Sequence, residues 1–206
     1  MNRRQVLVIP TGVANLASIV AGLERLDIEP ILQADAAAIA DAEYVVLPGV
    51  GAFAAGMKYL QKNALVDPLV RRIEESKPTL AVCLGLQLLC RESEESPGIN
   101  GLGVIDRPIR RFSNRVRVPQ LGWNKVVPAD CRLLQEGHAY FANSYRLAEA
   151  PEGWRAAYAQ YDGNFIAALE RGAVLACQFH PELSGPFGLD LLRRWLDNDA
   201  TGGDAC

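Results

Sequence analysis

The chain has 206 residues, half of them hydrophobic, and a formal net charge of −3. That length suits one domain with a sizeable core, and the composition excludes a disordered chain. Acidic and basic residues are nearly balanced and no basic tract stands out, so we expect no nucleic-acid partner. The first apolar run ends at Pro10, too early for a signal peptide, and no segment approaches membrane-spanning length.

In the first half of the chain, short apolar runs alternate with helical patterns. Asn15 can cap the first helix, whose apolar residues recur at helical spacing. This alternation predicts a parallel sheet with helices on both faces. The expected strands are 5–9, 30–33, 44–47 and 79–82, and the expected helices are 16–26, 54–60 and 66–76.

The second half is rich in short strand-like segments. Asp162-Gly163 and Arg171-Gly172 are typical of tight turns between antiparallel strands. We therefore expect an α/β domain over residues 1–200, with a mixed, mostly parallel central sheet and an antiparallel C-terminal half, and a frayed tail at 201–206. The segments are 116–127, 139–147, 155–161, 164–170 and 173–179, followed by a helix at 189–196.

Cys83 stands at a predicted strand-to-helix turn. Residues 79–82 form a buried run, and Gly85 and the leucines after it indicate a helix start. A cysteine in this position is held out of the sheet near helix N–H groups, which favour thiolate over thiol. The turn is similar to the nucleophile elbow of hydrolases, although the serine motif itself is absent. Alone, a cysteine between Val82 and Leu84 is more often a small core residue.

His180 directly follows the last predicted strand, in the tripeptide His180-Pro181-Glu182. If this segment stays extended, His180 and Glu182 point to the same side, so the carboxylate can orient the imidazole toward a thiol. We therefore expect activity to fall on acidification, as the base becomes protonated. His138, in turn-like surroundings, is interpreted as a surface residue.

The five cysteines, Cys83, Cys90, Cys131, Cys177 and Cys206, include no C-x-x-C pair and no metal-ligand spacing. An odd, scattered set is typical of reduced thiols in the cytoplasm. We expect no metal and no cofactor, with Cys90 in the core and Cys206 exposed.

Two glycines flank Val50 at the end of a predicted strand, in Gly49-Val50-Gly51. Backbone N–H groups in such a turn can stabilise an oxyanion, although an ordinary strand-to-helix turn has the same composition. The dinucleotide fingerprint is excluded because its third glycine is missing.

The segments 83-CLGLQ-87 and 178-QFHPE-182 together match the motifs of class I (triad) glutamine amidotransferases. The chain resembles this family over nearly its full length. Within that family the chain is most similar to the glutaminase subunits of imidazole glycerol phosphate synthase, an enzyme of histidine biosynthesis. This narrower likeness depends on 47-LPGVGAF-53, Gly122-Trp123-Asn124, Tyr140-Phe141, Ser144-Tyr145 and Asn15-Leu16.

The resemblance implies Cys83 as nucleophile, His180 as acid and base, and Glu182 as its partner. It assigns the amides of Val50 and Leu84 to the oxyanion, and it assigns glutamine binding to Gly49, Gln87, Glu95, Ser144 and Tyr145. It also implies a heterodimer with a (β/α)8 cyclase that receives ammonia through an internal tunnel, with Asn15 and Trp123 at the interface. A core position is the alternative for Trp123.

Several positions differ from the family pattern. Gln120-Leu121 replaces His-Met, Asn143 replaces histidine, Leu183 replaces a basic residue, and Pro10-Thr11-Gly12 replaces an aspartate at the end of the first strand. These differences leave two further hypotheses open: a paralogous glutaminase that serves another synthase, and a non-catalytic scaffold. A cysteine peptidase fits poorly, because no extended substrate groove can be inferred.

Overall fold

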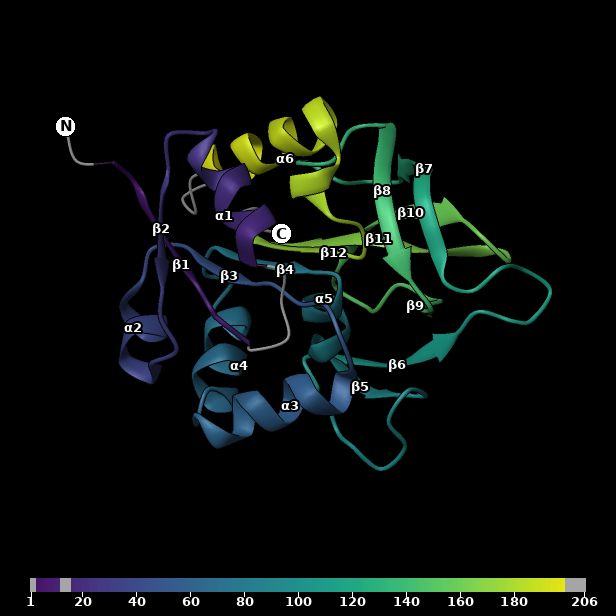
Figure 1. Ribbon diagram of the computed structural model, residues 1–206, viewed down its shortest axis with the longest axis horizontal. Coiled ribbons are helices and arrows are strands. Elements are labelled where there is room, and N and C mark those ends of the chain that lie inside the picture. Colours follow the sequence, from purple (N-terminus) through teal and green to yellow (C-terminus); the bar gives the residue numbers. More distant parts are fainter. Residues whose placement is uncertain (1–2, 12–15, 199–206) are drawn as a thin grey trace.

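A large mixed sheet forms the centre of the molecule, with helices on both faces (Figure 1). The computed structural model describes residues 3–11 and 16–198. The expected Asn15 cap and the tail at 201–206 therefore lie outside the described residues.

The nine strands of this sheet divide into a parallel and an antiparallel part. The parallel part runs in the order β2 (Glu29–Leu32), β1 (Gln5–Val8), β3 (Val45–Leu47), β4 (Thr79–Val82) and β12 (Val174–Cys177). The antiparallel part continues with β11 (Asn164–Arg171), β10 (Arg155–Gln160), β7 (Gln120–Pro128) and β8 (Gly137–Asn143). This confirms the predicted fold class.

A second, three-stranded sheet lies beside the first and contains β5 (Cys90–Ser93), β6 (Ile105–Arg111) and β9 (Tyr145–Leu147). The segment expected as one strand at 139–147 is in fact two strands in two sheets. β8 ends at Asn143 in the large sheet, and β9 begins at Tyr145 in the small one. Ser144 therefore stands where the chain passes from one sheet to the other.

The large sheet separates two hydrophobic cores, and helices cover the core on each face. α1 (Leu16–Glu24) and α6 (Gly185–Asp197) cover one face, and α2 (Ala36–Asp41), α3 (Phe53–Lys62) and α4 (Val66–Glu74) cover the other (Figure 1). Strand neighbours divide accordingly, with Val6 and Val8 in the first core and Leu7 and Ile9 in the second. This alternation is what burial on both faces of a strand requires.

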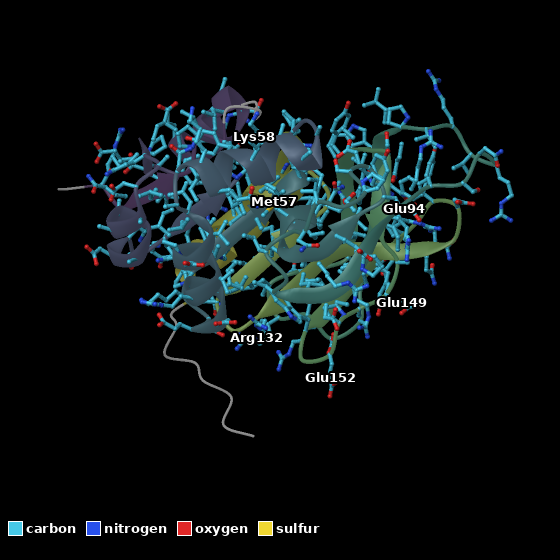
Figure 2. The ribbon with its side chains drawn as sticks, turned by 90° about the horizontal axis from the view of Figure 1, so that it is seen from below. Met57, Lys58, Glu94, Arg132, Glu149 and Glu152 are labelled. Atoms are coloured by element: carbon cyan, nitrogen blue, oxygen red, sulfur yellow. The ribbon has the colours of Figure 1, made fainter. Side chains whose placement is uncertain are left out.

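Most charged side chains lie on the outside of these layers. Figure 2 shows Glu149 and Glu152, which follow β9, at the edge of the molecule and pointing away from it. Met57 of α3 is buried, whereas its neighbour Lys58 is exposed. In the part of the chain that the structure covers, no helix is long and apolar enough to cross a membrane.

Among the described strands and α-helices, α2, β5 and β6 were not predicted. α2 has only six residues, four of them alanine, and its start is fixed by Asp35, whose side chain accepts a hydrogen bond from the N–H of Ala38 at 2.9 Å. β6 buries only Ile105 and Ile109. The charged residues between and after these isoleucines interrupt the apolar alternation by which a strand is predicted from sequence.

Arg72 of α4 is a buried cation that ties α2 to the sheet. Its guanidinium donates to the carbonyls of Ile39, Ala42, Glu43 and Pro78 at 2.7 to 3.0 Å and to the Thr79 hydroxyl at 3.1 Å. The side chain is 1% exposed, and this burial lowers the pKa of Arg72 to about 10, against a smaller opposite effect of Glu75.

Arg72→Met is therefore expected to destabilise the fold by about 3 kcal/mol, because several buried carbonyls lose a charged donor. The free energy of unfolding in urea measures this. Arg71→Met, on the exposed side of the same helix turn, is the control and is expected to change stability by less than about 0.5 kcal/mol. Equal effects of the two substitutions would contradict the role given to Arg72.

Candidate active site

The candidate residues converge at the carboxyl ends of three adjacent strands, β3, β4 and β12. These strands are parallel neighbours, with Leu47 opposite Ala81 and Val82 opposite Cys177. The glycine segment after β3, Cys83 after β4 and His180 after β12 therefore emerge at one edge of the sheet. Ligands of open α/β sheets bind at this edge.

Cys83 occupies a strained turn between β4 and α5 (Leu84–Leu89). Its φ of 53° and ψ of −105° are rare for a residue with a side chain. The Cys83 N–H donates to the carbonyl of Cys177 at 2.7 Å, which fixes the turn to β12. Gly85 is required here, because a Cβ at this position would overlap the carbonyl oxygen of Leu47. The predicted strand–cysteine–helix turn is thus present.

His180 and Glu182 form a buried pair. Nδ1 of His180 lies 2.8 Å from Oε1 of Glu182, and both side chains are 6% exposed. The predicted extended conformation of this segment is wrong, because Pro181–Leu183 forms a 3-10 turn, η1. The pair still forms, because only His180 is extended and the tight turn after it brings the carboxylate back to the ring.

Neighbouring elements hold this pair in place. The His180 N–H donates to the carbonyl of Tyr140 at 2.9 Å, and the Ser184 hydroxyl donates to the carbonyl of His180 at 2.6 Å. Gly22 lets α1 approach closely, since a Cβ there would lie 3.1 Å from the Cβ of Glu182. Oε2 of Glu182 has no hydrogen-bond partner among the described residues.

The electrostatics favour a protonated imidazole. Burial alone lowers the pKa of His180, but hydrogen bonds to Cys83 and Glu182, together with their negative charges, outweigh it and raise the pKa to about 10. At neutral pH His180 is therefore an imidazolium next to the sulfur. In the free enzyme, the predicted acid-side loss of activity therefore cannot come from protonation of a neutral histidine.

The glycine segment lies directly beside the cysteine turn. Gly49 packs so tightly on Leu84 that a Cβ would lie 2.6 Å from the Cβ of that residue, and Gly51 has a φ of 110°. The Leu84 N–H donates to the carbonyl of Gly49 at 3.1 Å. In this conformation the Leu84 amide, one of the two expected oxyanion donors, is engaged with the protein itself.

A small pocket of about 140 Å³ opens at Cys83. It brings together residues from α5, the glycine segment, the loop after β5 and the junction between β8 and β9. Its lining comprises Val50, Gly51, Cys83, Leu84, Gln87, Glu95, Ala142, Asn143, Ser144 and Tyr145. All the expected glutamine-binding residues except Gly49 are in this lining.

Glu95 and Gln87 are held by the backbone around the pocket. Oε2 of Glu95 accepts a hydrogen bond from the N–H of Phe53, at the start of α3, at 2.6 Å. The amide nitrogen of Gln87 donates to the carbonyl of Tyr145 at 3.3 Å. A carboxylate and an amide thus face the same small space as the cysteine.

Two site residues were missed as participants from the sequence. The sequence places Gln178 in the histidine motif without indicating a role for it, yet its side-chain nitrogen lies 3.6 Å from Sγ of Cys83. Asn143 was noted only as a departure from the family pattern. It lines the pocket, and its Oδ1 is buried with no hydrogen-bond partner among the described residues. The strand pattern places Asn143 on the buried face of β8, and this was the available signal.

The surface next to the catalytic motif is apolar. Leu121 and Trp123 on β7 are 68% and 58% exposed, and Leu183 in η1 is 42% exposed. A Cβ on Gly185 would lie 3.8 Å from the Trp123 ring, so the two segments are neighbours. The core alternative for Trp123 is therefore wrong. Asn15, the other expected interface residue, lies outside the described residues.

The other described cysteines, Cys90, Cys131 and Cys177, and the second histidine, His138, do not line the pocket. Burial raises the pKa of the Cys90, Cys131 and Cys177 thiols, which keeps them protonated. Cys90 is in the core, as predicted, and His138 is exposed. Within residues 3–11 and 16–198, no three His, Cys, Asp or Glu side chains group as metal ligands.

Comparison with known proteins connects this geometry to a family. The family profile described as glutamine amidotransferase class-I matches residues 12–198. Among curated proteins, the chain is 35% identical over 192 residues to the imidazole glycerol phosphate synthase subunit HisH of Carboxydothermus hydrogenoformans, covering 91% of this chain and 96% of that one. It is 37% identical over 196 residues to HisH of Methanothermobacter thermautotrophicus, covering 93% and 98%.

The chain also matches a longer plant protein, imidazole glycerol phosphate synthase hisHF, chloroplastic, of Arabidopsis thaliana. Identity is 43% over 166 residues, which cover 77% of this chain but 28% of the plant protein. Among solved structures, one titled as a glutamine amidotransferase superposes with a TM-score of 0.75 at 21% identity, covering 93% of this chain and 97% of that chain. The PurLQS structure from Thermotoga maritima gives 0.72 at 17% identity, covering 95% and 99%. These two likenesses concern the fold.

The family profile matches nearly the whole chain, and the HisH relatives align with it almost from end to end. The protein therefore belongs to the class I glutamine amidotransferases, among the HisH-type subunits of imidazole glycerol phosphate synthase.

Proposed function

We propose that this protein is the glutaminase subunit of an imidazole glycerol phosphate synthase, and that it hydrolyses glutamine through a thioester on Cys83. The observation that carries this proposal is the buried arrangement of Cys83, His180 and Glu182 at one edge of the sheet. A thiol in contact with an imidazolium that is itself bonded to a carboxylate can act as a nucleophile.

In the first step the Cys83 sulfur attacks the side-chain carbonyl carbon of glutamine. His180, protonated at neutral pH, gives its proton to the departing nitrogen, so the C–N bond breaks and ammonia leaves. In the second step the neutral His180 takes a proton from water, and the resulting hydroxide attacks the thioester. The C–S bond breaks, glutamate leaves, and the thiolate–imidazolium pair is restored.

The negative oxygen formed in each step needs donors, and the family resemblance assigns them to the Val50 and Leu84 amides. The Leu84 N–H is bonded to the Gly49 carbonyl at 3.1 Å, so this role requires the carbonyl to turn away first. A missing oxyanion donor costs about 10² to 10³ in rate. We therefore expect full activity only when the glycine segment changes conformation.

Glutamine itself would be held by the residues of the pocket. Glu95 is the candidate partner of the α-amino group, because its carboxylate lines the pocket and is fixed by the start of α3. Gln87, Ser144 and Tyr145 offer amide, hydroxyl and backbone groups in the same pocket. Gly49 does not line the pocket, so it would affect glutamine binding only by positioning the backbone of Val50 and Gly51, which do.

The ammonia would pass through an internal tunnel to a (β/α)8 cyclase subunit, which forms imidazole glycerol phosphate and aminoimidazole-carboxamide ribonucleotide. Support comes from the relatives named as subunits of imidazole glycerol phosphate synthase and from the apolar surface of Leu121, Trp123 and Leu183 beside the site. We also propose a cytoplasmic location, because a catalytic thiolate needs a reducing compartment. Cys83, Cys90, Cys131 and Cys177 are free thiols.

Trp123→Ser tests the proposed subunit interface. Loss of one large exposed aromatic is expected to weaken binding of the purified cyclase by about 30-fold, the factor that ~2 kcal/mol gives for an interface hot spot. Leu32→Ser is the matched control, since Leu32 is 53% exposed on β2, at the far edge of the sheet. Titration calorimetry measures both affinities. If the wild-type protein forms no complex with the cyclase and its activity is not stimulated, a different synthase is the partner.

The pH dependence tests the state of His180. Since the pKa of His180 is raised to about 10, glutaminase activity is expected to persist through neutral pH and to fall as the pH rises through about 10. The same ionisation is linked to stability. Because the folded-state value lies above the unfolded value of about 6.5, this stabilisation is fully present below pH 6.5 and is lost as pH rises through 10. An alkaline midpoint near 7 in the kcat/KM profile, which reports the free enzyme, would contradict this assignment.

A further inference from the structure

Gln178 places a side-chain amide against the reacting sulfur. The residue lies between the end of β12 and His180, and it is fully buried at 0% exposure. Its Nε2 donates to Sγ of Cys83 at 3.6 Å, a normal length for a hydrogen bond to the large sulfur atom. Its backbone N–H donates to the carbonyl of Ala167 at 2.8 Å, which fixes this part of the chain to β11. The contact therefore joins two segments whose backbones are both held by the sheet.

The orientation of the Gln178 amide is set by its other end. The Gln87 side-chain nitrogen donates to Oε1 of Gln178 at 3.0 Å and to the carbonyl of Tyr145 at 3.3 Å. Because that oxygen already accepts a hydrogen bond, the NH₂ group is the end that faces the sulfur. An amide turned the other way would place two NH₂ donors together at the Gln87 contact and an oxygen against the sulfur at the Cys83 contact.

A neutral hydrogen-bond donor can stabilise the sulfur in every step of the reaction, which His180 cannot do. His180 gives up its proton when ammonia leaves, so it changes charge between the two steps. The Gln178 amide has the same protons in both steps, and its N–H can stabilise the thiolate whenever the C–S bond forms or breaks. Hydrogen bonds to charged groups are about twice as strong as neutral ones.

We propose that Gln178 is a further catalytic residue, whose side-chain N–H holds the Cys83 sulfur and stabilises its thiolate, with Gln87 fixing the amide in that orientation. This inference rests on the proposed function, because it deepens the role of the same site. It also gives Gln87 a second task, since its nitrogen positions Gln178 while the residue lines the glutamine pocket.

The test measures the reactivity of Cys83 without glutamine. The full-length protein is alkylated with iodoacetamide across a pH series, and the modified cysteine is identified by mass spectrometry. Gln178→Glu keeps the shape of the side chain but presents an oxygen to the sulfur, and Gln178→Met removes both polar ends. Both substitutions are expected to slow alkylation of Cys83 at pH 7 by about tenfold and to move the half-maximal pH upward, the effect of losing one hydrogen bond to an anion.

Gln120→Glu is the matched control. Gln120 is also a buried glutamine, 4% exposed at the start of β7, and has no hydrogen bond to Cys83 among the described residues. It is expected to leave the alkylation profile unchanged. Thermal unfolding of each protein checks that the fold is retained.

Unchanged alkylation in folded Gln178→Met would overturn the proposal, since it would show that Gln178 only fills space. Slowing by Gln178→Glu without slowing by Gln178→Met would also overturn it, because repulsion from the new carboxylate would then suffice. The glutaminase assay with cyclase separates the two proposals. A wild-type protein without activity would reject the proposed function, whereas an active one with the outcomes above would reject only the role of Gln178.

Discussion

Replacement of Cys83 by alanine is expected to reduce glutamine-dependent synthesis by the complex to background, a loss of up to about 10⁶-fold. The reason is chemical: without the sulfur there is no thioester, and no other described thiol contacts an imidazole. Added ammonia should bypass the defect, because the cyclase then no longer needs the glutaminase. The two assays, with glutamine and with an ammonium salt, measure these rates on the same complex.

Cys131→Ala is the control for this experiment. Cys131 is only partly buried, and burial, together with nearby Glu170 and Asp130, raises the pKa of its thiol to about 12. Its replacement is expected to leave both rates unchanged. Glutaminase activity retained in Cys83→Ala would remove the nucleophile assignment altogether.

Glu182→Gln is expected to lower kcat by about 10³ to 10⁴-fold with little change in KM. The substitution keeps the size of the side chain but replaces the oxygen that lies 2.8 Å from Nδ1 of His180 by an uncharged amide. The Glu182 hydrogen bond and charge both raise the pKa of His180, so its alkaline limit of activity should also move to lower pH. Steady-state kinetics over a pH series measures both effects.

Glu182→Asp provides the comparison, since it keeps the charge at a greater distance and should retain part of the activity. A loss of less than tenfold in Glu182→Gln, with the alkaline limit unmoved, would show that the carboxylate does not orient the imidazole.

The central residues of the site were predictable because each is fixed by local chemistry. Cys83 stands between a buried strand and a helix start, and Gly85 is the residue that the close approach to Leu47 demands. His180 follows a strand and precedes Pro181. The structure adds that β12 and β4 are parallel neighbours, so their carboxyl ends bring these two distant segments to one edge of the sheet.

Other features depend on contacts that a sequence pattern does not contain. The tight turn at Pro181–Leu183 is held by Ser184, whose hydroxyl donates to the His180 carbonyl and accepts from the Tyr140 N–H, while His180 itself keeps the extended backbone expected before proline. The bond between the Leu84 amide and Gly49 joins two loops that are remote in sequence. The carbonyls around Arg72 come from two segments, residues 39–43 and Pro78, and the first of these is remote in sequence, so the pattern around Arg72 does not indicate its role.

The connection from β8 to β9, at the substrate pocket, is another feature that the sequence pattern does not predict. Residues 139–147 have one continuous strand pattern, yet the chain changes sheets at Ser144. The break is held by a local bond from the Asn143 side chain to the Tyr145 carbonyl at 2.9 Å and by a tertiary bond from the Phe112 N–H to the Ser144 carbonyl at 3.1 Å. The pocket exists because of this change of sheet.

Labelling with a diazoketone analogue of glutamine tests the nucleophile most directly. The reagent is incubated with the wild-type protein and its cyclase, with and without excess glutamine, and the modified peptide is sequenced by mass spectrometry. The expected result is one modification, on Cys83, which glutamine prevents and which abolishes glutaminase activity. Modification of another residue with the same loss of activity, or full glutaminase activity with Cys83 completely modified, would contradict the assignment.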